Sequence, residues 1–322
     1  MRMILTGHKR LELHNSTKPE PLEDYKLLKV QYCAVCRTDA KMWNEGHRDL
    51  VLPRVPGHEI VAIDSSAKRV AVWPGINCGG CGYCLSGREN LCEHMKIIGF
   101  HTDGGFADYI LAPQRSLIPV PDQIPSLLVC FAEPTGCALN AVDKLKLKPG
   151  DRMIIYGGGT LGLIAALVCL TKGAIPLIVE KSAEKIDKAK PFLDECGIQC
   201  RQDTGQTEFE AALNACPDHI AFNSSILKLA KGGRFSFFSG LSKNQNIQTD
   251  LLNLMHYKEA ELYGTYGLTR NNMAEAVVLI EQNVTAYEKL IEDLVPPQQV
   301  PSLFADVLSG KSLKYIIDFT EF

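Results

Sequence analysis

Apolar positions in the middle of the chain fall into short uninterrupted runs separated by glycine-rich turns. The run at 153–156 (MIIY) predicts a short buried strand, and the longer run at 161–170 predicts a helix packed on it. A second apolar run then leads to Glu180. Strand, turn, helix and strand in this order predict an α/β arrangement for this part of the chain.

Three further segments carry a clear pattern. Residues 60–72 (IVAIDSSAKRVAV) predict two strands joined by a tight turn. Further along, we expect a helix over 218–231 that ends at Gly232-Gly233, followed by a strand over 234–241. The most apolar stretch, at 154–170, is interrupted by glycines and does not reach the ~18 continuous apolar residues of a membrane span. We therefore expect no membrane insertion.

The glycine turn after the first strand has the spacing Gly157-x-Gly159-x-x-Gly162. Between a strand and a helix, with an acid at the end of the next strand, this spacing predicts dinucleotide binding. The alternative is an ordinary tight turn. Glu180 should accept hydrogen bonds from ribose hydroxyls and repel a 2′-phosphate, which favours NAD over NADP. Lys181 weakens that preference, because a lysine could pair with a 2′-phosphate.

Composition limits the classes of partner. The chain has 322 residues, of which 46% are apolar and 22% charged, and its formal net charge is −3. This length favours two domains, and the composition is typical of a globular protein. Because its lysines are scattered, we expect no nucleic acid partner. The N-terminus lacks a long apolar stretch followed by a cleavage site, so we expect a cytoplasmic protein.

Four cysteines are crowded into fifteen positions, Cys78, Cys81, Cys84 and Cys92. In a reducing cytoplasm disulfides rarely persist, whereas four thiolates on a glycine-rich loop can close around Zn²⁺. Free thiols or a redox switch are the alternatives. Since four sulfur ligands leave no open position, such a zinc stabilises a loop and does no catalysis.

A second set of metal-binding residue types lies upstream. Cys36, His58 and Glu59 offer a thiolate, an imidazole and a carboxylate, the donors of a catalytic zinc that keeps a position for water or substrate. Taken singly, each is more often a core or surface residue. Their joint occurrence favours a catalytic metal site.

These motifs together resemble the zinc-dependent medium-chain dehydrogenase/reductase family, the alcohol dehydrogenases and their polyol and threonine dehydrogenase relatives. The resemblance rests on CRTD at 36–39, GHE at 57–59, the four-cysteine loop, DGGFADYILAP at 103–113 and the glycine turn, in this order. It covers nearly the whole chain. It implies an α/β protein with a GroES-like β-rich catalytic domain at 1–134 that holds both zincs, a Rossmann cofactor domain with a doubly wound parallel sheet at 135–265, and a return segment at 266–322. It also implies an active site in the cleft between the domains, and a homodimer or homotetramer.

The resemblance assigns roles near the catalytic zinc. The third ligand position of the family falls on Glu133, where the polyol and threonine branch carries a carboxylate. With Cys36 and Glu59 this would put three negative charges on one divalent ion, so we expect one glutamate to bind firmly and the other to yield to water or substrate. Which glutamate binds stays open. Thr38 is expected to take the hydroxyl proton, and Lys41 stands where many relatives have a histidine that continues the proton path.

The resemblance also implies a coenzyme site. Two basic residues, Arg37 and Lys314, fall where the family grips the pyrophosphate, although either could be a surface residue. The expected set comprises Arg37, Gly157, Gly159, Thr160, Leu161, Gly162, Glu180, Lys181, Ser239 and Lys314. Trp43, Phe100, His101 and Tyr266 are candidates to line the substrate pocket, with core packing as the alternative for the aromatics.

The predicted function is that of an alcohol dehydrogenase that transfers hydride between a secondary alcohol, polyol or hydroxy amino acid and NAD(P), with two zincs per chain. Nothing in the residues selects one small-molecule substrate or the physiological direction. One alternative is a catalytically inactive nucleotide-binding protein of the same fold that keeps only the structural zinc. Another is a zinc ribbon for nucleic acid or protein partners, which the complete nucleotide turn argues against.

Overall fold

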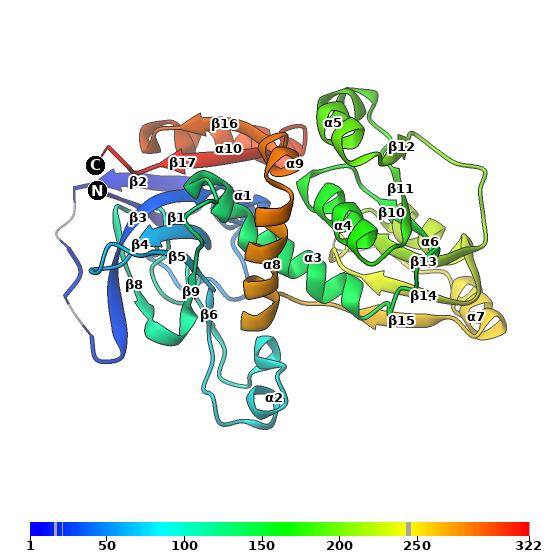
Figure 1. Ribbon diagram of the computed structural model, residues 1–322, viewed down its shortest axis with the longest axis horizontal. Helices are drawn as coiled ribbons and strands as arrows, with labels where there is room; N and C mark the ends of the chain where they lie inside the picture. The colour runs from blue at the N-terminus through cyan, green and yellow to red at the C-terminus, as the bar shows by residue number, and fades with distance from the viewer. Residues whose placement is uncertain (16–17, 21, 243–245, 322) are drawn as a thin grey trace. The chain divides into compact units, whose positions relative to one another are not determined.

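A computed structural model describes residues 1–15, 18–20, 22–242 and 246–321 of the chain. The chain divides into two compact units (Figure 1). The first combines Met1–Gly136 with Leu268–Phe322, and the second is Cys137–Gly267. Among the described residues, no helix is long and apolar enough to cross a membrane.

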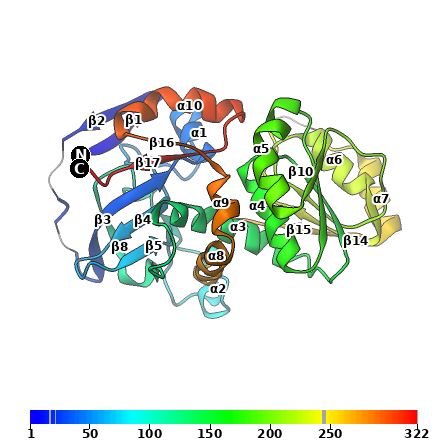
Figure 2. The same ribbon diagram turned by 45° about the horizontal axis from the view of Figure 1, so that its top comes forward.

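The second unit is built on a six-stranded sheet in the order β12-β11-β10-β13-β14-β15. All of its strand pairs are parallel, which confirms the predicted doubly wound α/β sheet. Helices α4 and α5 lie on one face and α6 and α7 on the other (Figure 2). The strands are β10 (Arg152–Tyr156), β11 (Ile175–Val179), β12 (Gln199–Arg201), β13 (Phe209–Asn214), β14 (Leu229–Phe237) and β15 (Glu261–Gly264). The helices are α4 (Thr160–Thr171), α5 (Ala183–Cys196), α6 (His219–Leu227) and α7 (Thr249–Lys258).

Strand order reverses at β10, the first strand of this unit. The chain moves from β10 to β11 and β12 on one side, then returns to pair β13 on the other side of β10. Ligands of doubly wound sheets bind at such a reversal, outside the carboxyl ends of the strands. The turn that starts at Gly157 directly follows β10 and therefore lies at this position.

One predicted element of this unit is wrong in its bounds. The helix expected over 218–231 ends at Leu227, and β14 begins at Leu229 and runs through the two glycines expected to end the helix. Leu229 is fully buried and pairs with Phe209, so tertiary pairing outweighs the local helix pattern. The strand expected over 234–241 ends at Phe237.

The first unit contains a seven-stranded sheet in the order β16-β17-β3-β4-β5-β9, with β8 also paired to β3. Its long central strand β3 contributes buried residues such as Leu28, Val30 and Cys33 to the core. The two strands predicted over 60–72 are present as β4 and β5, paired antiparallel. The strands of the sheet are β3 (Tyr25–Ala34), β4 (Glu59–Ile63), β5 (Arg69–Val72), β8 (Tyr109–Pro113), β9 (Leu117–Pro119), β16 (Ile291–Val295) and β17 (Lys314–Asp318).

Smaller elements complete this unit. Two antiparallel pairs are formed by β1 (Arg2–Gly7) with β2 (Arg10–His14) and by β6 (Gly75–Ile76) with β7 (Lys96–Ile97). The helices are α1 (Arg37–Glu45), α2 (Gly82–Leu85), α8 (Arg270–Gln282), α9 (Val284–Glu288) and α10 (Val300–Ser309). Helix α3 (Ala132–Asp143) crosses from the first unit into the second.

Sheet register brings three distant segments to one place in the first unit. Ala34, the last residue of β3, pairs with Glu59 at the start of β4 and with Ile316 in β17. Cys36 follows two residues after β3, and Lys314 begins β17. The side chains that make up the second predicted metal set are therefore delivered by the ends of neighbouring strands.

Candidate metal and coenzyme sites

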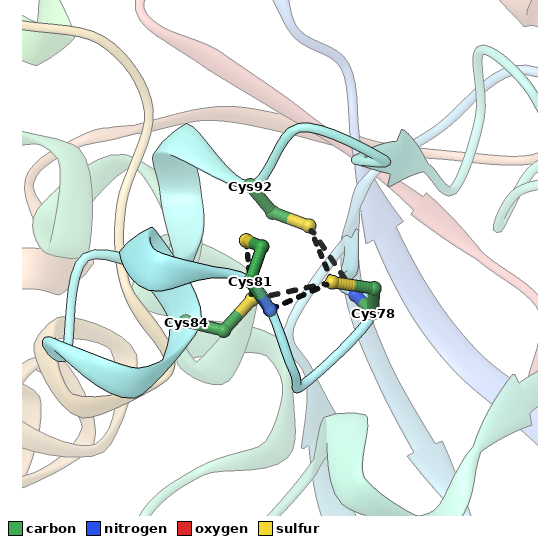
Figure 3. Close-up of side chains that lie close together, drawn as sticks. All are labelled: Cys78, Cys81, Cys84 and Cys92. Atoms are coloured by element: carbon green, nitrogen blue, oxygen red, sulfur yellow. Dashed lines mark hydrogen bonds between the residues drawn. The ribbon is translucent and has the colours of Figure 1, made fainter.

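The four cysteines of the loop that carries α2 face a common centre (Figure 3). The sulfur of Cys78 lies 3.5 Å from that of Cys92 and 4.0 Å from that of Cys84, and the sulfurs of Cys81 and Cys84 are 3.6 Å apart. A zinc with four sulfurs at about 2.3 Å requires the sulfurs to be roughly 3.8 Å apart. The donor set and its spacing thus form a structural zinc site, as the sequence predicts.

Backbone amides around this loop favour thiolates. The amides of Cys84 and Glu93 point at the sulfur of Cys81 and lower its pKa to about 6. The amides of Gly80 and Cys81 likewise lower the pKa of Cys78. Burial instead raises the pKa of Cys92 to about 11, and a bound cation would offset that cost. The loop is therefore arranged to present negative sulfurs to a metal.

The second metal set gathers at the strand ends described above. One ligand atom from each of Cys36, His58 and Glu59 lies within 4.8 Å of the others. His58 and Glu59 are buried, with 5% and 1% of their surfaces exposed. Cys36 is the N-cap of α1, and the amide of Thr38 donates to its sulfur at 3.4 Å. Three donors of a catalytic zinc are thus in place on short, well-supported segments.

Asp39 organises this set although it is not one of the donors. Its side chain is fully buried and accepts hydrogen bonds from the amides of Cys36, at 2.9 Å, and Gly57, at 3.2 Å. Its second role is toward His58, whose Nδ1 lies 3.4 Å from Asp39 Oδ1. Burial alone would lower the pKa of His58, but the charges of Asp39 and Cys36 hold it well above its usual value. The same negative potential attracts a cation.

Glu59 has a buried partner that comes from the far end of the chain. Both of its carboxylate oxygens lie 2.8 Å from Nζ of Lys314, which is itself buried. Lys314 donates a hydrogen bond to Oε1, whereas the buried Oε2 has no hydrogen-bond partner. A buried carboxylate oxygen without a hydrogen bond fits a metal ligand, since such an atom is otherwise costly. The residues present therefore fit a zinc.

Glu133 lies in the first turn of α3 and outside the group of three donors. Burial alone would lower the pKa of Lys314, but the charges of Glu59 and Cys36 and, after them, the charge of Glu133 raise it. The structure thus places both glutamates near one lysine. Of the two, Glu59 is the one grouped with Cys36 and His58.

The glycine turn of the second unit has the close contacts expected of a phosphate-binding turn. Gly157 has φ +112°, a conformation that side chains rarely adopt. A Cβ on Gly162 would lie 1.9 Å from the carbonyl oxygen of Gly157, so only glycine fits there. Gly159 is the N-cap of α4, whose first residues are Thr160 and Leu161. The backbone at this helix N-terminus is open to an anion.

Glu180 is buried at the end of β11 and is held from three sides. The amide of Gly158 donates to Oε2 at 2.9 Å and the amide of Ser182 donates to Oε1 at 3.0 Å. Nζ of Lys185 also lies 2.6 Å from Oε2. Burial would raise the pKa of Glu180, but Lys185 and these amides lower it, so the side chain is a carboxylate at neutral pH. It stands directly against the glycine turn.

The remaining predicted coenzyme residues differ in their surroundings. Arg37 is exposed and donates to the carbonyl oxygen of Leu308 at 3.2 Å. Lys181 is an exposed cation that pairs with Asp218 at 3.2 Å. The amide and carbonyl of Ser239 are both hydrogen-bonded to Asn214. Lys314 pairs with Glu59 and is not a surface cation, a pairing that the sequence analysis did not predict.

Comparisons with known proteins bear directly on these sites. Residues 23–122 match the model of the alcohol dehydrogenase GroES-like domain. A zinc-type alcohol dehydrogenase-like protein of Haemophilus influenzae is 28% identical over 90% of this chain and 89% of its own length. The L-galactonate-5-dehydrogenase of Escherichia coli is 27% identical over 94% of both chains. The chain belongs to the zinc-type medium-chain alcohol dehydrogenase family. Polyol and threonine dehydrogenases are among its relatives in that family.

Solved structures of this dehydrogenase family share the fold over the whole chain. The 2R,3R-butanediol dehydrogenase of Bacillus subtilis superposes with a TM-score of 0.87 at 20% identity, covering 98% of this chain and 99% of that one. A protein of Sinorhizobium meliloti solved with NADP bound superposes with a TM-score of 0.90 at 23% identity, covering 98% of both chains. The GroES-like domain and the Rossmann sheet expected for the family are both confirmed.

Two residues that support these sites, Asp39 and Lys185, were not predicted from the sequence. Asp39 could have been found, because an acid three residues after a helix N-cap is a capping-box signal. Lys185, which pairs with Glu180, lies five residues after it, and no sequence motif marks this pairing. Of the pocket candidates, Trp43 packs on Phe304 and Phe100 packs on His58, with ring centroids 5.4 and 5.2 Å apart.

The cysteines outside the two metal sets differ in burial. Burial raises the pKa of Cys33, Cys130 and Cys169, which are fully buried. Burial also raises the pKa of Cys196 and Cys200 to about 11, although both are only partly buried. These thiols are therefore neutral at physiological pH.

Proposed function

We propose that this protein is a zinc-dependent dehydrogenase that transfers hydride between an alcohol and a nicotinamide coenzyme. The observation that carries the proposal is the gathering of Cys36, His58 and Glu59 within 4.8 Å, separate from a complete four-cysteine site. A structural zinc alone would not require this second set of donors. The glycine turn with Glu180 supplies the expected coenzyme site in the same chain.

Three residues are proposed to hold the catalytic zinc and to leave one position open. Bound zinc would supply a Lewis acid that favours loss of the proton from an alcohol oxygen. Glu59 can offer Oε2 while Oε1 keeps its hydrogen bond from Lys314. Of the two glutamates, Glu59 is therefore proposed as the zinc ligand, and Glu133 is proposed to remain beside Lys314.

Lys314 also limits the negative charge of the site. Cys36 and Glu59 would bring two negative charges to the ion, and the buried ammonium offsets one of them. Thr38 is proposed to receive the substrate proton at its hydroxyl. Its place at the second residue of α1, with its amide on the sulfur of Cys36, keeps that hydroxyl close to the donors. Lys41 stands one turn further along the helix.

NAD is proposed as the preferred coenzyme. The carboxylate of Glu180 is buried, charged and fixed by two backbone amides and Lys185, so it would resist displacement by a 2′-phosphate. Lys181 is already paired with Asp218 and does not favour NADP.

The substrate class is proposed to be a secondary alcohol, a polyol or a hydroxy amino acid. Relatives with near-complete coverage support this range: a sorbitol dehydrogenase of Halalkalibacterium halodurans at 26% identity and an L-threonine 3-dehydrogenase of Chelativorans at 27%. Identity at this level does not select one substrate.

The test is a panel of secondary alcohols, polyols and 3-hydroxy amino acids, offered with NAD and NADP to protein loaded with zinc. Formation of reduced coenzyme, monitored by absorbance, would support the proposal. Metal analysis distinguishes the enzyme from an inactive nucleotide-binding protein of the same fold. About two zincs per chain are expected for the enzyme, and about one for the inactive protein. One zinc and no turnover across the panel would reject the proposed function.

A homodimer or homotetramer is proposed as the assembly. The edge strand β15 has a free backbone edge within the described sheet, and Leu262 on it is 43% exposed. Exposed edges with apolar side chains favour pairing with another strand. Light scattering on the purified protein should give a mass of at least two chains, and a monomer at micromolar concentration would contradict this.

A further inference from the structure

Asn214 is the last residue of β13, and its side chain is fully buried. Its Nδ2 donates to the carbonyl oxygens of Ser239, at 2.8 Å, and Cys216, at 3.2 Å. Its Oδ1 accepts a hydrogen bond from the amide of Phe238 at 3.0 Å. Since both N–H groups and the carbonyl oxygen of the side chain are used, its orientation is fixed.

The three partners of Asn214 lie in two loops that have left the sheet. One loop, 215–217, leads from β13 to the N-cap of α6, and the other, 238–242, follows β14. Beyond a strand end the backbone groups leave the ladder of the sheet and need other partners, which side chains can supply. Asn214 joins the two loops, and Ser242 adds a second link, because its amide and its hydroxyl both donate to the carbonyl oxygen of Pro217 at 3.1 Å.

The first of these loops also packs against the glycine turn. The amide of Ala215 donates to the carbonyl oxygen of Tyr156, the last residue of β10, at 2.7 Å. A Cβ on Gly157 would lie 3.2 Å from the carbonyl oxygen of Ala215 and 3.3 Å from Cβ of Cys216. The hydrogen bonds of Asn214 therefore connect segments at the ends of three neighbouring strands, β10, β13 and β14.

Strand order indicates which part of a dinucleotide would lie over these loops. Glu180, the proposed partner of the adenosine ribose, directly follows β11, and the glycine turn proposed for the pyrophosphate follows β10. A dinucleotide that extends along the carboxyl edge of the sheet from β11 to β10 next reaches β13 and β14. The nicotinamide half would therefore lie over the two loops that Asn214 joins.

We propose that Asn214 is a positioning residue for the nicotinamide half of the coenzyme. The inference rests on the proposed function, because it takes NAD(H) as the ligand of this sheet. Asn214 fixes the backbone of both loops before the ligand binds, which removes the entropic cost of ordering them on binding. Its buried side chain acts through the loops and not by touching the coenzyme.

Two ligands separate the two halves of the coenzyme site. NADH covers the whole site, whereas ADP carries only the adenosine and the pyrophosphate. Calorimetry on the zinc-loaded protein should show that Asn214→Ala weakens NADH binding at least tenfold and changes ADP binding less than threefold. A general loss of folded protein would lower the amount of both ligands bound and leave the ratio of the two affinities unchanged.

Arg234→Met is the matched control. The guanidinium of Arg234 also makes three hydrogen bonds within the second unit. Its partners are the carbonyl oxygens of Leu145 and Lys146 and the carboxylate of Asp151. These partners precede β10 and therefore lie at the amino edge of the sheet, away from the proposed coenzyme site. The variant should lower Tm and keep both affinities within threefold of the wild type.

Two further measurements do not depend on the folding of Asn214→Ala. Asn214→Asp keeps the size of the side chain and the acceptor for Phe238, but it turns an oxygen toward the carbonyls of Cys216 and Ser239. It should therefore show the same selective loss of NADH affinity. In the wild type, NADH should slow hydrogen exchange in peptides that cover 215–217 and 238–242 more than ADP does.

The outcomes separate this inference from the proposed function. If NADH binds the wild type and both Asn214 variants equally well, or if the affinities for NADH and ADP fall by the same factor, the inference is overturned and the dehydrogenase proposal stands. Equal effects of NADH and ADP on hydrogen exchange also overturn it. A selective loss of NADH affinity supports the inference even if no alcohol of the panel is turned over. If the wild type binds neither ligand, the inference and the proposed coenzyme site are both rejected.

Discussion

Replacing Lys314 with methionine removes the cation that pairs with the buried carboxylate of Glu59, and the effect of this change on stability should depend on zinc. Nζ lies 2.8 Å from both oxygens of Glu59, and only 7% of Lys314 and 1% of Glu59 is exposed. Burial alone would lower the pKa of Lys314, but the charges of Glu59 and Cys36 raise it well above its usual value. Lys314 is therefore a charged ammonium at neutral pH.

The magnitude follows from the fate of Glu59. In zinc-free protein the variant leaves a buried carboxylate without its cation, which costs about 3–5 kcal/mol of unfolding free energy. With zinc bound, a second cation compensates the carboxylate, and the loss should fall to about 1–2 kcal/mol, near the value of one charge-assisted hydrogen bond. For a unit of this size each kcal/mol lowers Tm by about 2–4 °C.

The assay is thermal and urea unfolding of the wild type and variants, each with zinc and after chelation. Since chelation also empties the four-cysteine site, each variant is compared with the wild type in the same state. The double variant Glu59→Gln with Lys314→Met is the matched control, and it should recover at least half of the zinc-free loss. If the single variant loses the same stability with and without zinc, or if the double variant recovers nothing, the reasoning is refuted.

Three further predictions concern the other sites. Cys81→Ser should lower the zinc content from about two to about one per chain and reduce Tm, because a structural zinc contributes folding free energy; an unchanged zinc content by elemental analysis would contradict the four-thiolate site. Glu180→Ala should shift the ratio of kcat/KM for NAD to that for NADP at least tenfold toward NADP, about 1.4 kcal/mol, and steady-state kinetics that leave the ratio unchanged would count against its role. The pKa of Asp151 is lowered, against the effect of burial, by the amide of Lys148 and by Arg234 at 2.6 Å, so its contribution is present at neutral pH and lost as the pH falls through its folded pKa. Asp151→Asn should therefore cost about 1 kcal/mol at pH 7 and nothing at a pH of about 2 to 3, and urea midpoints that differ equally at both pH values would disprove the assignment.

The sequence predicted those features whose residues lie close together along the chain. The glycine turn was predictable because Gly157 and Gly162 meet steric demands set within six residues. The four-cysteine site was predictable for the same reason, since its ligands lie within one loop. The strands of the sheet that contains this turn are all parallel, as alternating strands and helices imply.

Features that depend on distant pairing could not be predicted. Glu59 and Lys314 are separated by 255 positions, and only the register of β4 and β17 against β3 brings them together. A lysine is usually exposed at the surface, so the sequence gave no reason to expect that Lys314 is buried. The end of α6 at Leu227 was not predicted for a similar reason, because the residues that follow it form β14, which pairs with β13.

The most direct test of the central claim, that Cys36, His58 and Glu59 hold a zinc that serves hydride transfer, is stepwise return of zinc to the metal-free protein. Reduced coenzyme formation and zinc content are measured together on an accepted alcohol, for the wild type and for Cys36→Ser. We expect wild-type activity to appear with the second zinc per chain. Cys36→Ser should bind one zinc and still bind NADH, as measured by fluorescence. Its turnover should be at least a thousandfold slower, which corresponds to about 4 kcal/mol of lost transition-state stabilisation. Full turnover by the wild type with one zinc, or undiminished turnover by Cys36→Ser, would contradict it.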